Sequence, residues 1–284
     1  MKLAVFAASK QYYDLGHAYQ DSVRIETFKD AFLRAKTCGV DGLEPAICRP
    51  EELDVAELKS AMEQTGMGIS MFGTSYWHSE LGLELINPDD RICAEALRMF
   101  KQALKVGKEC GVPVGLGALR SGIHDNNKTV AWHTDRLVEI CKDIATYCSE
   151  IDTFFTIEPQ HRLYQNMINN VPQALDVINR VGSDRFKMTF DLKQSFIEED
   201  IFVAIAQARN LLYNVHFMDC DHAPVAPSGL LDFAAIIKAL YAVNFDGWLS
   251  LTMLNVNEDR VRRQDEHLKV SSSYVRELLA NLGC

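Results

Sequence analysis

The sequence lacks several features that would point to familiar classes of protein. No two of its eight cysteines are spaced as CxxC, so we expect free, buried thiols in a reduced compartment. No apolar run is long enough to span a membrane, and no apolar signal segment opens the chain. Positive charge is also scarce, because the formal net charge is -10. This charge disfavours nucleic acid or an anionic membrane as a partner. We therefore expect a cytoplasmic protein with a small-molecule partner.

The sequence does contain a regular alternation of short apolar segments and longer amphipathic ones. Strand candidates cover residues 3–7, 42–47, 68–76, 113–118, 154–159, 186–191, 214–219 and 248–253. Between them, apolar residues recur at three- and four-residue spacing, and several of these patterns end in glycine, which is typical of helices. This alternation predicts an α/β fold, a (β/α)8 TIM barrel with one domain over residues 1–284. A doubly wound open sheet is the alternative, but no glycine-rich phosphate loop follows the first strand.

Three of the apolar segments end in residues that can bind a metal ion, namely Glu158, Asp191 and His216. Because the strand ends of a parallel barrel converge on one mouth, we expect these side chains to be neighbours. Two carboxylates and one imidazole are suited to a divalent metal. An isolated acid at a strand end is also common as a helix cap, so the prediction depends on all three together. The last strand candidate ends in Thr252, which is not an acid.

The segments around these residues resemble the xylose isomerase-like barrel enzymes, especially the ketose 3-epimerases and the sugar-phosphate isomerases and epimerases. The matching positions in EPQHRLYQNMINN, DLKQSFIEED and HFMDCDHAPVAPSGLLDF are Glu158, Pro159, Arg162, Asn166, Ile168, Asn169, Asp191, the acidic run 197–200, His216, Pro227, Gly229 and Asp232. The resemblance implies an isomerase or epimerase of carbohydrate metabolism. It implies that Glu158, Asp191 and His216 hold one divalent metal (Mn, Mg, Co or Zn), that Glu158 is also catalytic, and that the protein is a homo-oligomer.

The chain departs from the family pattern at four positions. Tyr164 stands in place of a second substrate-facing acid, Gln194 in place of a histidine, and His222 in place of an arginine. Thr252 stands in place of the last-strand glutamate, which in the family is both a metal ligand and one of two catalytic bases.

Several residues around the mouth are expected to contact a substrate. Trp77 follows the third strand candidate, where an aromatic ring suits a sugar. The resemblance suggests further contacts from the strand ends and loops, and the substrate-binding prediction as a whole comprises Trp77, Arg162, Gln194, His222 and Thr252. Glu44 belongs to the second strand candidate and is expected to face the same mouth, as a weaker candidate for a ligand or a substrate contact.

We expect a metal-dependent isomerase or epimerase of a small sugar or sugar phosphate that acts through an enediolate. Epimerisation most simply takes two bases, whereas a 1,2-isomerisation can use one. Thr252 therefore favours one-base isomerisation. The alternatives are a dehydratase of a keto-cyclitol or dehydroshikimate-type substrate and a non-catalytic sugar-binding relative.

Overall fold

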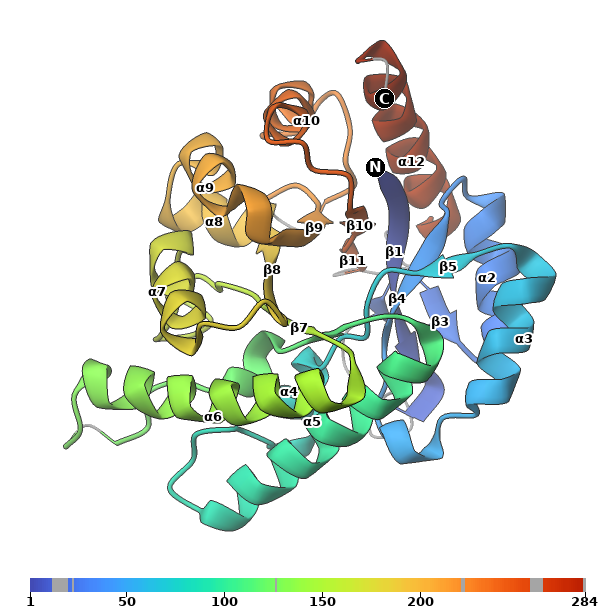
Figure 1. The fold of residues 1–284 in the computed structure, drawn as a ribbon. Helices are drawn as coiled ribbons and strands as arrows, with labels where there is room; N and C mark the ends of the chain where they lie inside the picture. The colour runs from blue at the N-terminus through green and yellow to red at the C-terminus, as the bar shows by residue number, and fades with distance from the viewer. Residues whose placement is uncertain (12–19, 22, 126, 221–222, 256–262, 283–284) are drawn as a thin grey trace.

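The structure is a computed structural model that describes residues 1–284 except 12–19, 22, 126, 221–222, 256–262 and 283–284. Its centre is a sheet of parallel strands surrounded by helices (Figure 1). The strands of this sheet are β1 (Lys2–Ser9), β3 (Val23–Ile25), β4 (Gly42–Ala46), β5 (Gly68–Ile69), β6 (Val114–Gly115), β7 (Phe155–Ile157), β8 (Phe186–Asp191), β9 (Leu212–Phe217) and β10 (Trp248–Leu251). Their order is β5-β4-β1-β10-β9-β8-β7-β6, with β3 beside β1.

The two ends of this strand order meet through a parallel bridge between Phe72 and Val114. The Phe72 N–H donates to the Pro113 carbonyl at 3.0 Å, and the Gly115 N–H donates to the Phe72 carbonyl at 2.8 Å. The bridge brings the β5 side of the sheet to β6, as in a barrel. The expected α/β barrel class is therefore confirmed.

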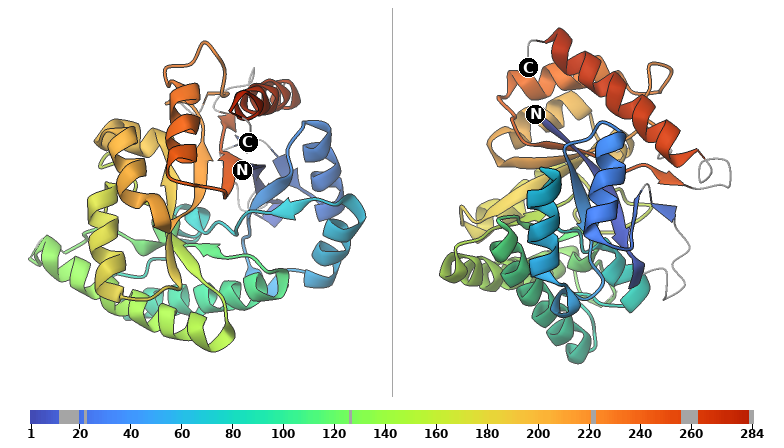
Figure 2. Two further views of the ribbon diagram at one scale, coloured as in Figure 1. Left: turned by 45° about the horizontal axis from the view of Figure 1, so that its top comes forward. Right: turned by 90° about the vertical axis from the view of Figure 1, so that its right-hand side faces the viewer.

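Helices cover the outside of the sheet, as the two views in Figure 2 show. They are α2 (Phe28–Thr37), α3 (Val55–Thr65), α4 (Ser75–Leu81), α5 (Asp90–Cys110), α6 (Val130–Ile151), α7 (Val171–Val181), α8 (Leu192–Glu198), α9 (Ile201–Ala208), α10 (Phe233–Ala242) and α12 (Gln264–Asn281), with 3-10 turns η1 (Pro50–Glu52), η2 (Gly117–Arg120) and η3 (Arg209–Leu211). A short antiparallel pair joins β2 (Gln20–Asp21) to β11 (Leu254–Asn255). No helix in the described part of the chain is long and apolar enough to cross a membrane.

Local sequence explains where many of the helices begin and end. Thr129, for example, caps α6 by accepting from the Trp132 N–H, and Asn170 caps α7 in the same way. The helix α7 ends at Gly182, whose φ of 69° is the left-handed conformation that glycine adopts without strain.

The strands are buried because helices cover the sheet, and the barrel interior contains polar side chains. Successive side chains of a strand point to opposite faces, so residues two apart share a face. Thr189, with Asp191 two residues later, and Asn214, with His216 two residues later, are accordingly buried side chains on neighbouring strands. Ser250 donates to the Asn214 side-chain oxygen at 2.9 Å. This alternation carries the functional side chains into the barrel.

The prediction of a strand over residues 68–76 is wrong in its second half. Strand β5 ends at Ile69, Phe72 and Gly73 form only isolated bridges, and α4 begins at Ser75. The Thr74 hydroxyl, directly before the helix, donates to the Gly115 carbonyl at 2.7 Å. The aromatic residues that followed Phe72 in the sequence therefore belong to a helix.

Candidate metal centre

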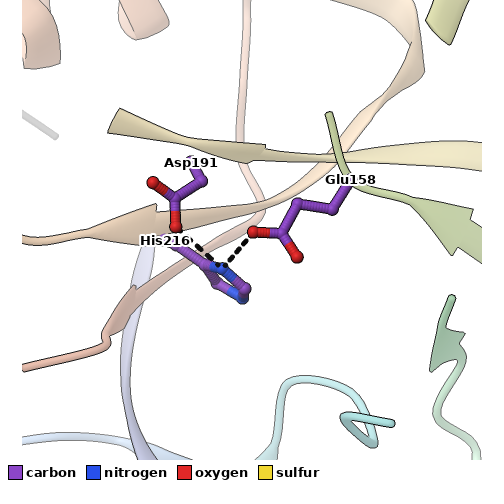
Figure 3. A group of neighbouring side chains, drawn as sticks. All are labelled: Glu158, Asp191 and His216. Atoms are coloured by element: carbon purple, nitrogen blue, oxygen red, sulfur yellow. Dashed lines mark ion pairs between the residues drawn. The ribbon is translucent and has the colours of Figure 1, made fainter. Parts of the chain in front are cut away.

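Glu158, Asp191 and His216 come together in the barrel, as predicted (Figure 3). Glu158 directly follows β7, Asp191 is the last residue of β8, and His216 lies in β9 opposite Asp191 in the parallel register. One ligand atom from each of the three residues lies within 4.8 Å of the other two. The Nδ1 atom of His216 is 3.3 Å from Glu158 Oε1 and 3.4 Å from Asp191 Oδ2. All three side chains are buried.

The two carboxylates each use their second oxygen for a local contact. Asp191 Oδ1 accepts from the Gln194 N–H at 2.8 Å and so caps α8. Glu158 Oε2 accepts from the Gln160 amide at 3.3 Å. The helix-capping role that is common for a strand-end acid thus exists at Asp191, but it occupies only one oxygen. Oδ2 of Asp191 and Oε1 of Glu158 both face His216.

The other nitrogen of His216 contacts a residue that sequence reasoning ranked low, Glu44 in β4. His216 Nε2 lies 2.8 Å from Glu44 Oε1, and Glu44 Oε2 accepts from the Asn214 amide at 2.8 Å. A carboxylate that accepts from one imidazole nitrogen fixes the ring so that the other nitrogen can bind a metal. The available signal was a lone acid in an otherwise apolar strand, GLEPA.

The charges at the site perturb one another. Burial would lower the pKa of His216, but the carboxylates of Glu44 and Glu158 together with hydrogen bonds raise it well above its usual value. Burial raises the pKa of Glu158, and the charge of His216 opposes that rise. Burial also favours the neutral form of Glu44. The charge of His216 and the hydrogen bonds that Glu44 accepts nevertheless lower the pKa of this carboxyl. Several carboxylates close to one imidazole therefore favour binding of a positive charge at this site, either a proton on the imidazole or a cation.

This donor set fits a divalent metal. Two carboxylate oxygens and one imidazole nitrogen converge from three adjacent strands, and Glu44 holds the imidazole from behind. Buried carboxylates need a positive partner, which a proton on His216 or a metal ion supplies.

A cavity of about 330 Å³ opens over these residues. Its lining is Phe6, Tyr76, Ser79, Glu158, Gln160, His161, Leu163, Tyr164, Asp191, Lys193, Gln194, His216, Met218 and Thr252. Apolar and aromatic walls with a few converging polar groups are typical of a small-molecule site. Sequence reasoning missed Phe6, Gln160 and His161. Phe6 lies in β1, where an aromatic residue is ordinary for a strand, and Gln160 and His161 lie in the loop after β7, whose conformation decides where they point.

Two of the residues predicted to contact a substrate line this cavity. Thr252, directly after β10, is buried and its hydroxyl lies 3.6 Å from the Met218 sulfur. The Gln194 side-chain oxygen accepts from the His161 N–H at 2.8 Å, which ties α8 to the loop after β7. His222 lies outside the described residues.

The structure places two other predicted residues away from the cavity. The expectation for Trp77 is wrong: this side chain is 0% exposed, and its indole N–H donates to the Ile47 carbonyl at 2.8 Å. Because α4 is a helix, Tyr76 and not Trp77 faces the cavity. Arg162 does not line the cavity either. Its side chain is 70% exposed and forms an ion pair with Glu198 at 2.6 Å.

The sequence is similar to those of sugar epimerases. A probable ketose 3-epimerase of Synechocystis sp. is 27% identical over 80% of this chain and 78% of its own length. The 3-dehydro-D-guloside 4-epimerase of Escherichia coli is 26% identical over 84% of this chain and 90% of its own length.

Solved structures show the same fold. An L-ribulose 3-epimerase superposes with a TM-score of 0.78 at 19% identity and covers 98% of this chain and 95% of its own. The 3-keto-D-glucoside 4-epimerase from E. coli superposes with a TM-score of 0.77 at 19% identity over 98% and 99% of the two chains. Residues 32–274 match the model of the family described as the xylose isomerase-like TIM barrel. The chain belongs to this family.

Proposed function

We propose that this protein is a metal-dependent epimerase or isomerase of a small sugar or sugar derivative. The buried group of Glu158, Asp191 and His216 under a cavity is the observation that carries this proposal. The relatives named above act on ketoses and keto-glycosides by their names, which supports a carbonyl-bearing sugar as the substrate. A cytoplasmic location, a single domain over residues 1–284 and homo-oligomerisation stay predictions.

Glu158, Asp191 and His216 would hold one divalent ion, which would act as a Lewis acid and stabilise negative charge on the substrate's carbonyl oxygen. Glu44 keeps the Nδ1 atom of His216 directed toward the two carboxylates by accepting from Nε2. The apolar side chains of the cavity limit water around the reacting carbon and so favour proton transfer to a fixed group.

Glu158 is the proposed base at the carbon next to the carbonyl. Loss of that proton gives an enediolate, and return of the proton at the neighbouring carbon gives an isomer. Burial raises the pKa of Glu158, which makes its carboxylate a stronger base. The Gln160 amide, 3.3 Å from Oε2, orients the carboxylate.

Thr252 decides between the reactions of this class. A hydroxyl does not act as a base at neutral pH, so inversion of a centre lacks its second base at the end of β10. A transfer along one face by Glu158 needs no second base. The same single base would also suffice for loss of a β-hydroxyl, so dehydration of a keto-cyclitol or a dehydroshikimate-type acid is the second candidate.

Metal content and a sugar screen test the proposal. We expect the purified protein to hold about one divalent ion per chain after supply of manganese, and the Asp191→Asn and His216→Ala variants to lose it. The metal-loaded protein is then incubated with ketoses, their phosphates and keto-glycosides, with proton NMR detecting isomers and ultraviolet absorbance detecting an enone. No metal in any sample, or no turnover of any of these substrates, would contradict the proposal.

A further inference from the structure

Arg120, the last residue of η2, is a buried arginine that contacts main-chain carbonyls. Its side chain is 0% exposed. Its guanidinium donates to the carbonyl of Glu158 at 3.3 Å, to that of Ile168 at 3.0 Å and to that of Ser121 at 3.2 Å. Burial lowers the pKa of Arg120 to about 10, with Glu158 opposing the shift, so the group stays charged at neutral pH.

No carboxylate among the described residues forms an ion pair with this guanidinium. Removing a cation from water is costly unless its donors are satisfied, and an apolar side chain of similar length would fill the same space without that cost. Arg120 therefore contributes little to stability by its charge alone. Its five N–H donors in a rigid plane do, however, suit the joining of separate backbone segments.

The segments that Arg120 joins are the two ends of one loop. Residues 158–170 connect β7 to α7, and the carbonyls of Glu158 and Ile168, near the two ends of this connection, both accept from the same guanidinium. Within this loop lie the cavity residues Gln160, His161, Leu163 and Tyr164, in addition to Glu158.

The loop conformation is one that needs such support. Ile168 has a φ of 57°, a left-handed conformation that is strained for a β-branched residue. The carbonyl of this residue accepts both from Arg120 and from the Gln160 N–H at 3.1 Å. Asn166 also joins the loop to the segment that follows Arg120. Its side-chain oxygen accepts from the Ile123 N–H at 2.7 Å, and its NH2 donates to the Ile123 carbonyl at 3.1 Å.

We propose that Arg120 is a positioning residue that clamps the loop over residues 158–168 and thereby holds Glu158 and the loop's cavity residues in place. The catalytic consequence rests on the proposed function, whereas the effect on the loop does not. Removal of the clamp loosens the loop, weakens metal binding through Glu158, and lowers kcat/KM because the base and the cavity wall lose their alignment.

The test uses Arg120→Met, which keeps the length and removes every donor, and Arg120→Lys, which keeps the charge and one site of donation. Arg276→Met is the matched control, because Arg276 also donates to a main-chain carbonyl, that of Gly39 at 3.3 Å, and does not line the cavity. Exposed Arg162 provides a reporter, since a looser loop fits the active site of trypsin more readily and is cleaved after Arg162 faster. Hydrogen exchange at the Gln160 amide, manganese affinity by calorimetry, and kcat and KM complete the measurements.

For Arg120→Met we expect cleavage after Arg162 and exchange at Gln160 to accelerate about 10-fold or more. Manganese affinity falls about 10-fold, and kcat/KM falls about 10²-fold. Arg120→Lys recovers part of each effect, and Arg276→Met matches the wild type. Unchanged rates of cleavage after Arg162 and of exchange at Gln160 in a folded Arg120→Met variant overturn the clamp. If that variant does not fold, wild-type rates of cleavage and exchange in Arg120→Lys overturn it. A loosened loop with unchanged metal affinity and kinetics overturns the positioning role.

The two proposals fail in different ways. A wild-type protein that turns over no sugar, while Arg120→Met shows a loosened loop and weaker manganese binding, supports the clamp and contradicts the proposed function. Turnover that Arg120→Met leaves unchanged contradicts the positioning role of Arg120 and keeps the proposed function.

Discussion

Replacement of Glu44 by glutamine tests whether the imidazole of His216 is held for a metal. Glu44 accepts at both oxygens, from His216 Nε2 at 2.8 Å on one side and from the Asn214 amide at 2.8 Å and the Ser70 hydroxyl at 3.4 Å on the other. A glutamine has one oxygen and one NH2, so in either orientation a donor faces a donor. The variant also removes a negative charge that raises the pKa of His216.

We expect Glu44→Gln to weaken metal binding about 10–100-fold, the usual effect of losing a partner behind a metal-binding histidine. This range corresponds to about 1.4–2.7 kcal/mol. The double variant Glu44→Gln with Asn214→Asp restores an acceptor opposite the new amide, while Ser250 can still donate to position 214. It should recover part of the lost affinity, because the glutamine oxygen can then face His216.

The assay is titration of manganese into metal-free protein by isothermal calorimetry, with circular dichroism to confirm that each variant is folded. Glu63→Gln, an exposed acid-to-amide change on α3, controls for the general effect of losing one negative charge. Equal manganese affinity in the wild type and in a folded Glu44→Gln variant would refute the reasoning. So would a double variant that binds more weakly than the single one, because hydrogen-bond complementarity would then not be the determinant.

Three further predictions follow from the same contacts. In the metal-free protein the raised pKa of His216 means that its protonated form stabilises the fold fully below about pH 6.5, and that this contribution is lost as the pH rises through the raised value. Urea unfolding at a series of pH values measures this loss, and His216→Ala should remove the dependence. Thr252→Glu places a carboxylate in the cavity and should raise the rate of epimerisation at least about 10²-fold, whereas Thr252→Gln should not epimerise the substrate. Equal epimerisation rates of Thr252→Glu and the wild type, measured by NMR, would count against a missing second base. Phe155→Ala should destabilise the fold by about 3–5 kcal/mol in urea, because this buried ring stacks on Phe186 at 4.2 Å; a loss below about 1 kcal/mol would contradict that packing.

The sequence was sufficient to bring Glu158, Asp191 and His216 together for a geometric reason. In a parallel barrel every strand end faces the same mouth, so once the segments 154–159, 186–191 and 211–216 are recognised as strands, the polar residues at their ends must converge. The prediction needed no knowledge of loop conformation. Glu44 was harder to assign, since a lone acid in a strand can equally be a ligand, a substrate contact or, as here, the partner of a histidine.

Trp77 shows where sequence reasoning fails. Residues 68–76 are apolar and aromatic enough for a strand, and a short run of this kind does not distinguish a strand from a helix by period. Once α4 begins at Ser75, each residue turns by about 100° relative to the one before it, so Tyr76 lines the cavity and Trp77 enters the core. Arg120 carried no sequence signal because its partners are carbonyls, which every residue has.

The most direct test of the central claim follows the carbon-bound proton next to the carbonyl. Metal-loaded protein is incubated with ketoses and keto-glycosides in deuterated water, and proton NMR records both formation of an isomer and loss of the proton signal at the adjacent carbon. With the wild type we expect the isomer to form, the proton signal to be lost, or both. We expect no isomer and no loss of the signal after the metal is chelated, and the same result with a folded Glu158→Gln variant. The assignment of Glu158 as the base of a metal-dependent proton transfer would be contradicted if the metal-loaded wild type formed no isomer and kept the proton signal. It would also be contradicted if Glu158→Gln reacted at the wild-type rate.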